Sequence, residues 1–147
     1  MIHYIDIHTH RKDAVQREGV FQLISARSYD TLSDPDRYYS WALHPWDSAH
    51  SDTSKLLEFI VKKSILSKTL AIGETGIDAL RGATQNVQIE IFTFHAKLAE
   101  ACQKPLIIHC VRAWSEVLAI RKQVKPRMAW IVHGFRGKES LAQQLLQ

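Results

Sequence analysis

Short apolar segments alternate with helical segments along this chain of 147 residues, and that alternation constrains the fold more than any other feature. Six apolar segments have the length and β-branched content of strands, and they cover residues 2–7, 20–26, 38–43, 69–73, 106–108 and 128–132. Amphipathic periodicity predicts helices at about 52–66, 85–103, 113–123 and 138–147, with Asp52 or Ser54 and Thr84 as the first two N-caps. Such alternation predicts parallel strands with right-handed crossovers. We therefore expect an α/β fold with one parallel sheet, in a single domain over residues 1–147.

Composition and charge place the chain among globular proteins. Apolar residues make up 46% of it, which is ordinary for a folded domain. No apolar run reaches the roughly 18 residues of a membrane span, and the N-terminus has no signal-peptide pattern. Cys102 and Cys110 lack the spacing of a metal finger, so we expect reduced thiols in a cytoplasmic protein. The formal charge of +4 suits an anionic partner.

Side chains able to bind a metal follow five of the six predicted strands. His8 and His10 are two residues apart, so on extended backbone both point to the same side. The other four groups are His44, Glu74, His109 and His133. The carboxyl ends of parallel strands form one rim, where active sites are built. The sequence therefore predicts a metal site at this rim, whereas His95, within a helix, is expected to pack or to face solvent.

The residue types indicate how two divalent ions would be held. His8 and His10 with a carboxylate can bind one ion and His109 and His133 a second, with Glu74 as the bridge. Imidazole and carboxylate together suit Zn²⁺, Mn²⁺ or Co²⁺, with Mg²⁺ where oxygen ligands dominate. Two ions about 3.5–4 Å apart activate a water and stabilise the leaving oxygen of a phosphodiester. Glu74, His109 and His133 are accordingly the catalytic candidates.

Five segments of the chain carry a family resemblance. They are DIHTH at residues 6–10, ALHP at 42–45, AIGETGID at 71–78, IIHC at 107–110 and VHGF at 132–135. In this order they resemble the motifs of the TatD family of metal-dependent hydrolases, and the helical pattern Gln88, Phe92, His95, Leu98 and Ala99 is similar as well. The resemblance implies a TIM-type (β/α) barrel of the amidohydrolase type, with DNase or related phosphoesterase activity. It also implies the same metal ligands: His8 and His10 at one ion, Glu74 between the ions, and His109 and His133 at the second.

The chain departs from the family pattern at three places. Trp46 follows His44 and Pro45 where family members usually have a second His. The family's Arg lies two residues after the fifth-strand His, but here Arg112 comes one residue later than that. The family also has a metal-binding Asp on its eighth strand, whereas no Asp follows Asp78 in this chain. With six predicted strands in place of eight, we expect an incomplete barrel and a truncated chain.

Substrate contacts are expected from polar residues that follow the strand ends, namely His44, Asp78, Arg112 and Arg136. Asp78 either lines the pocket or caps the next helix. Trp46 and Trp114 either stack on bases or pack against the protein.

The leading functional hypothesis is metal-dependent hydrolysis of phosphodiesters, with DNA as the substrate. One alternative is a metal-dependent hydrolase of small amides, lactones or esters, and another is a partial barrel that binds metal or nucleic acid without catalysis. If the sheet stops after the sixth strand, its first and last strands have unpaired edges. Those edges predict an oligomer, a fragment that depends on a partner, or a longer protein that has been partly degraded.

Overall fold

The computed structural model describes residues 1–2, 4–11, 18–31 and 34–146, and in them strands and helices alternate as the sequence predicts. The elements are β1 (Tyr4–Thr9), β2 (Val20–Arg27), β3 (Tyr38–Ala42), the 3-10 helix η1 (Pro45–Asp47), α1 (Thr53–Ser64), β4 (Thr69–Asp78), α2 (Gln85–Cys102), β5 (Leu106–Val111), α3 (Trp114–Val124), β6 (Trp130–Val132) and α4 (Glu139–Leu146). None of the helices found in these ranges has the length and apolar character needed to cross a membrane.

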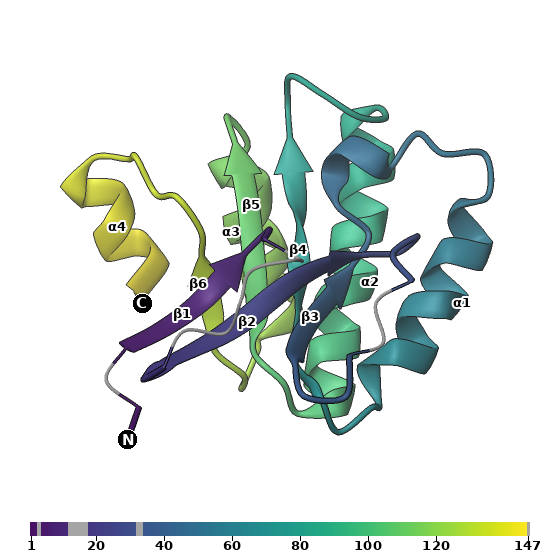
Figure 1. Ribbon diagram of the computed structural model, residues 1–147. Coiled ribbons are helices and arrows are strands. Elements are labelled where there is room, and N and C mark those ends of the chain that lie inside the picture. The colour runs from purple at the N-terminus through teal and green to yellow at the C-terminus, as the bar shows by residue number, and fades with distance from the viewer. Residues whose placement is uncertain (3, 12–17, 32–33, 147) are drawn as a thin grey trace.

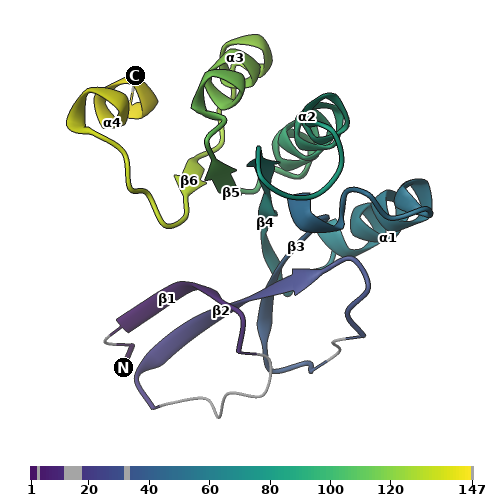
Figure 2. The same cartoon turned by 90° about the horizontal axis from the view of Figure 1, so that it is seen from above.

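The six strands form one sheet in the order β1-β2-β3-β4-β5-β6, and every neighbouring pair is parallel. Seen from above, the strands follow a curved path, with α1, α2 and α3 on its outer side and the two edge strands at its ends (Figure 2). The side view shows the strand ends that carry the arrowheads of β4 and β5 at one edge of the sheet (Figure 1). The predicted α/β fold with six strands of an incomplete barrel is therefore confirmed.

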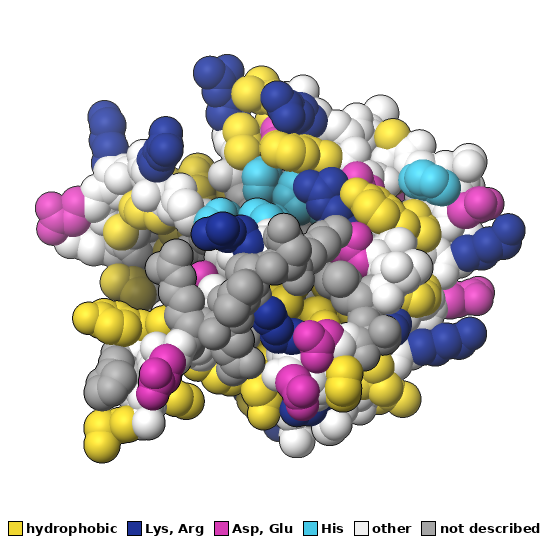
Figure 3. Space-filling view, in the orientation of Figure 1, with side chains coloured by type: hydrophobic (Ala, Val, Ile, Leu, Met, Phe, Trp, Pro, Cys, Tyr) yellow, Lys and Arg dark blue, Asp and Glu magenta, His cyan; other side chains and the backbone are white. Residues whose placement is uncertain are grey.

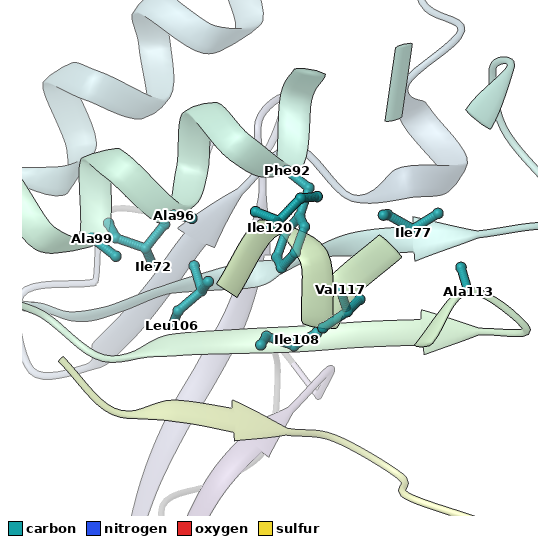
Figure 4. Close-up of a cluster of buried hydrophobic side chains, with 10 residues drawn as sticks. All are labelled: Ile72, Ile77, Phe92, Ala96, Ala99, Leu106, Ile108, Ala113, Val117 and Ile120. Atoms are coloured by element: carbon teal, nitrogen blue, oxygen red, sulfur yellow. The ribbon is translucent and has the colours of Figure 1, made fainter. Parts of the chain in front are cut away.

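The main core lies between β4 and β5 on one side and α2 and α3 on the other (Figure 4). Ile72, Ile77 and Ile108 of the sheet meet Phe92 of α2 and Val117 of α3, and all five are shielded from solvent. Burying each large aliphatic or aromatic side chain stabilises the fold by about 1.5–3 kcal/mol. A second cluster packs β2 and β3 against α1. The two strands that carry Glu74 and His109 are thus fixed by the largest apolar cluster.

Four strands extend beyond the ends predicted for them, β2 by the single residue Arg27. β4 was expected to stop before Glu74 but continues to Asp78, and its register with β5 shifts between Ile72 and Thr75. β5 likewise continues through His109, and β1 continues through His8. The prediction ended β1, β4 and β5 directly before their candidate metal ligands His8, Glu74 and His109. His109 still pairs with Gly76 of β4, and β1 and β4 resume pairing after His8 and Glu74, so a polar residue does not end the ladder.

The predicted N-caps hold their positions but do not act through their side chains. Asp52 precedes α1 and Thr84 precedes α2, and neither side chain makes a capping hydrogen bond. The Asp52 carboxylate instead lies 3.6 Å from Lys55 Nζ.

The two ends of the sheet are open. Within the described residues β1 pairs only with β2, and β6 pairs only with β5. The side chains of Tyr4 and Ile5 on β1 are 72% and 67% exposed, and α4 contributes no buried residue. The predicted unpaired edges are therefore present, and one of them is largely apolar.

Candidate metal centre

The centre of the site is the carboxylate of Glu74, which is only 4% exposed. Imidazole nitrogens surround both of its oxygens. Glu74 Oε2 lies 3.2 Å from His8 Nε2, 3.4 Å from His10 Nε2 and 3.6 Å from His44 Nε2, while Oε1 lies 2.9 Å from His109 Nδ1. These four histidines come from β1, the turn after it, the turn after β3, and β5. The predicted rim thus brings residues far apart in sequence onto one carboxylate.

Two sets of possible ligand atoms share Glu74, each within 4.8 Å. The first set is His8, His10 and Glu74, which matches the predicted first metal site. The second set is His44, Glu74 and His109, so His44 stands where the prediction had His133. The His133 ring packs against His8 instead, with 4.1 Å between the ring centroids. The ligand roles of these residues stay predictions, with His44 as an added candidate.

The chemistry of this donor set fits a divalent cation. A neutral imidazole has one N–H and one lone pair. The Nε2 atoms of His8 and His10 lie 3.1 Å apart and both face Glu74 Oε2, so their polar atoms converge on one small volume. Imidazole nitrogens together with a carboxylate form a typical ligand set for Zn²⁺, Mn²⁺ or Co²⁺.

The protonation states at the centre suit metal ligands as well. Burial by itself raises the pKa of the Glu74 carboxyl, but hydrogen bonds from the histidines, His109 foremost, outweigh burial and hold that pKa well below its usual range. The pKa values of His10 and His133 are lowered, first by burial and then by the neighbouring His8. An anionic carboxylate and neutral imidazoles are the forms that bind a metal.

His109 is held from two sides. Its Nδ1 faces Glu74, and its Nε2 lies 3.2 Å from Asp78 Oδ2. Burial lowers the pKa of His109, but the hydrogen bonds to the two carboxylates raise it overall. Asp78 is buried and accepts a hydrogen bond of 2.7 Å from Trp46 Nε1. Asp78 does not cap α2, whose N-cap is Thr84; it contacts His109 instead, and its expected contact with a substrate stays a prediction.

A pocket of about 270 Å³ opens beside Glu74. Its lining residues are His10, Arg27, His44, Trp46, Glu74, His109, Cys110, Val111, His133 and Gly134. In the space-filling view histidine atoms reach the surface, with basic and apolar side chains around them (Figure 3). Cys110 is a free thiol there, and burial raises its pKa to about 11, so it stays protonated at neutral pH.

Sequence reasoning missed Arg27, whereas the substrate contacts expected of Arg112 and Arg136 stay predictions. Arg27 is the last residue of β2, where the strand was expected to end one residue earlier. Grouping the polar residues that follow predicted strands identified the histidines, and the same procedure would also have identified Arg27. Arg112 and Arg136 are exposed and are not among the residues that line this pocket, although their neighbours Val111 and Gly134 are. His95 packs in the interior, which confirms its predicted structural role.

Comparisons with known proteins find similar metal-dependent hydrolases. A model of the TatD-related DNase family matches residues 19–147. An uncharacterized metal-dependent hydrolase TatD of Mycobacterium tuberculosis is 31% identical over 134 residues, which cover 82% of this chain and 48% of that protein. The 3'-5' ssDNA/RNA exonuclease TatD of Citrobacter rodentium is 29% identical over 117 residues, which cover 77% of this chain and 43% of that protein. The chain therefore spans about half the length of the curated relatives it matches.

A solved structure supports the fold. The crystal structure of YJJV, a TatD homologue from Escherichia coli, superposes with a TM-score of 0.74 at 22% identity. The match covers 98% of this chain and 64% of that one. The six curved strands thus correspond to part of a larger fold of the same kind.

Proposed function

This chain belongs to the family of TatD-related DNases, and from that premise we propose that it is a metal-dependent hydrolase that cleaves phosphodiester bonds of DNA or a related nucleic acid. The observation that carries the proposal is the buried carboxylate of Glu74 with four imidazole nitrogens within 3.6 Å of its oxygens. One relative, from Citrobacter rodentium, carries the name of a single-stranded DNA and RNA exonuclease, and this supports the choice of substrate.

A divalent cation bound at this centre would supply a Lewis acid for a phosphoryl oxygen and would lower the pKa of a water molecule. The chain's own residues would hold the substrate. Arg27 lines the pocket, and its Nη1 is held 3.0 Å from the Tyr29 hydroxyl and 3.4 Å from the Asp47 carboxylate. A guanidinium fixed in this way suits the oxygens of a phosphate. Asp78 and Glu74 fix the orientation of the His109 ring between them.

A second candidate is a metal-binding chain without turnover. One observation favours it: in the described part of the chain, each of the two ligand sets contains a single carboxylate, the shared Glu74. Glu74 would be needed as a ligand of the metal, which would leave no second carboxylate in either set to take a proton from the attacking water. Metal bound without hydrolysis of any substrate would support this candidate.

The test of the proposed function is Glu74→Gln, which keeps the size of the side chain and removes its charge. We expect the variant to lose bound metal by elemental analysis and to lose hydrolysis of single-stranded DNA by more than about 100-fold. Combining His8→Ala with His10→Ala should have the same effect through the first ligand set.

The matched control is Glu58→Gln, the same chemical change at an exposed position on α1. It should leave both metal content and activity at the level of the unmodified protein. Circular dichroism would show that each variant is folded. Metal-dependent nuclease activity retained by a folded Glu74→Gln protein would refute the proposal, and turnover of small esters or lactones without nuclease activity would redirect it to that substrate class.

A further inference from the structure

Trp46 stands at the rim of the pocket, exposed and yet firmly held. It belongs to η1, the short helix directly after β3, and its side chain is 42% exposed. Its ring nitrogen donates a 2.7 Å hydrogen bond to the buried Asp78, and its backbone N–H donates to His44 Nδ1 at 3.2 Å. The ring also meets His44 edge to face, with 4.9 Å between centroids. The indole is therefore a fixed plane beside the metal centre, in contrast to a mobile surface side chain.

Packing in the interior does not account for this residue. Trp46 belongs to none of the three clusters of buried apolar side chains. Its contacts are with residues of the site: His44, Asp78 and His109, whose ring centroid lies 5.9 Å from that of the indole. A partly exposed indole at the edge of a polar pocket is a feature of ligand sites.

Two guanidinium groups lie over the Trp46 ring, and a stacked base would take the place of the exposed Arg81 group. Arg81 Cζ lies 4.6 Å from the ring centroid and Arg27 Cζ lies 5.8 Å from it, which are cation–π distances. Arg27 reaches the ring from the end of β2, and Arg81 from the turn after β4. An aromatic plane interleaved with basic groups is the arrangement that binds single-stranded nucleic acid, because bases stack on the ring and the cations follow the phosphates.

We propose that Trp46 stacks on the nucleobase next to the phosphate held at the metal centre, with Arg27 and Arg81 on the phosphates of the same strand. This inference rests on the proposed function and narrows its substrate. A base within a duplex is already stacked on its neighbours, so only an unpaired base can use the Trp46 plane. The substrate class is therefore a single strand or a frayed end. Recognition is independent of the base, because every base has an aromatic face.

Equilibrium binding to the metal-loaded protein tests this inference apart from catalysis. The probes are two fluorescein-labelled, phosphorothioate-linked tetranucleotides, one of four thymidines and one in which every sugar lacks its base, followed by fluorescence anisotropy. We expect the unmodified protein to bind the thymidine probe about tenfold more tightly. Trp46→Ala should remove that preference, because it should lower the affinity for the thymidine probe and leave the affinity for the probe without bases unchanged. Since the readout is binding, a chain without hydrolytic activity would still give this result.

Three further variants separate stacking from other effects. Trp46→Phe keeps an aromatic plane and loses the hydrogen bond to Asp78, so it should retain most of the preference. Arg81→Ala should lower the affinity for both probes equally, because both carry the same phosphate backbone. Tyr4→Ala removes an exposed aromatic side chain on β1 outside the pocket, and it should change the affinity for neither probe. Equal affinity of the unmodified protein for the two probes would overturn the inference. An equal loss of affinity for both probes in Trp46→Ala would overturn it as well.

Discussion

His95 shows how a single buried side chain supports the site without touching it. It is fully buried in α2, where its Nδ1 donates to the Ile91 carbonyl at 2.8 Å and its Nε2 accepts from the Leu43 N–H at 3.1 Å. Both bonds are satisfied only by the neutral ring with its hydrogen on Nδ1. Burial lowers the pKa of His95 to about 4. The residue thus ties α2 to the end of β3, directly before His44.

This geometry predicts a pH dependence of stability. The unfolded chain takes up a proton at His95 near pH 6.5, whereas the folded chain does so only near pH 4. The unfolded state therefore binds more protons in this window, and the free energy of unfolding falls as the pH falls. We expect a loss of roughly 3 kcal/mol from this residue between pH 7 and pH 4. Urea unfolding across that range measures it.

The control is His95→Gln, which cannot titrate there but still offers an amide to the Leu43 N–H. Because other groups also titrate, the comparison is between slopes. The variant should lose less stability than the unmodified protein between pH 7 and pH 4, and equal slopes would show that His95 is not the group responsible.

At the scale of elements, β4 is the strand on which the site depends. It supplies both Glu74 and Asp78, four residues apart, with Gly76 between them. Gly76 has φ +149°, and a Cβ built there would overlap the backbone carbonyl oxygen of His109 on β5. The absence of a side chain at Gly76 therefore lets β5 approach closely at the level where the carboxylates face His109.

Gly76→Ala should accordingly destabilise the protein by more than about 3 kcal/mol, because the backbone of β5 has to move and the residue has an unfavourable φ. Gly134→Ala is the matched control, since Gly134 has φ +61° but a Cβ there would meet nothing within 4 Å. Its cost should be about 1–2 kcal/mol, from the conformation alone. Chemical unfolding of both variants distinguishes steric overlap with β5 from the cost of the backbone conformation. Similar losses in the free energy of unfolding would contradict the role assigned to Gly76.

At the scale of the whole molecule, the curved sheet is open at both ends. Edge strands with free N–H and C=O groups pair readily with other chains unless charge or covering segments prevent it. On β1 the exposed Tyr4, Ile5 and Ile7 add apolar surface to that edge. We therefore predict that the 147-residue chain self-associates through β1 and β6.

Light scattering at increasing concentration measures this association. Ile5→Lys should shift the protein toward the monomer, because a charge on an edge strand opposes pairing. Ile65→Lys is the control: Ile65 is 75% exposed at the end of α1, far in sequence from either edge strand, so it should leave the mass unchanged. A monodisperse monomer of the unmodified protein at high concentration would rule out self-association.

The sequence by itself determined the order of the elements and the residues of the rim. Periodicity of apolar residues is a local property, so it located the six strands and the helices between them. Parallel strands bring their carboxyl ends to one edge, and for this reason His8, His10, His44, Glu74 and His109 could be grouped before any distance was known. The incomplete barrel came from the resemblance to the TatD family together with the count of six predicted strands.

Only the tertiary structure decided which of these atoms meet. Cross-strand register and turn conformation placed His44 with Glu74 and His109, and His133 against His8. They also extended β4 to Asp78, brought Arg27 and Trp46 into the pocket and left Arg112 outside it. These outcomes depend on how strands shift relative to one another and on where a turn leads the chain. The spacing of residues along one segment encodes neither the shift between strands nor the path of a turn.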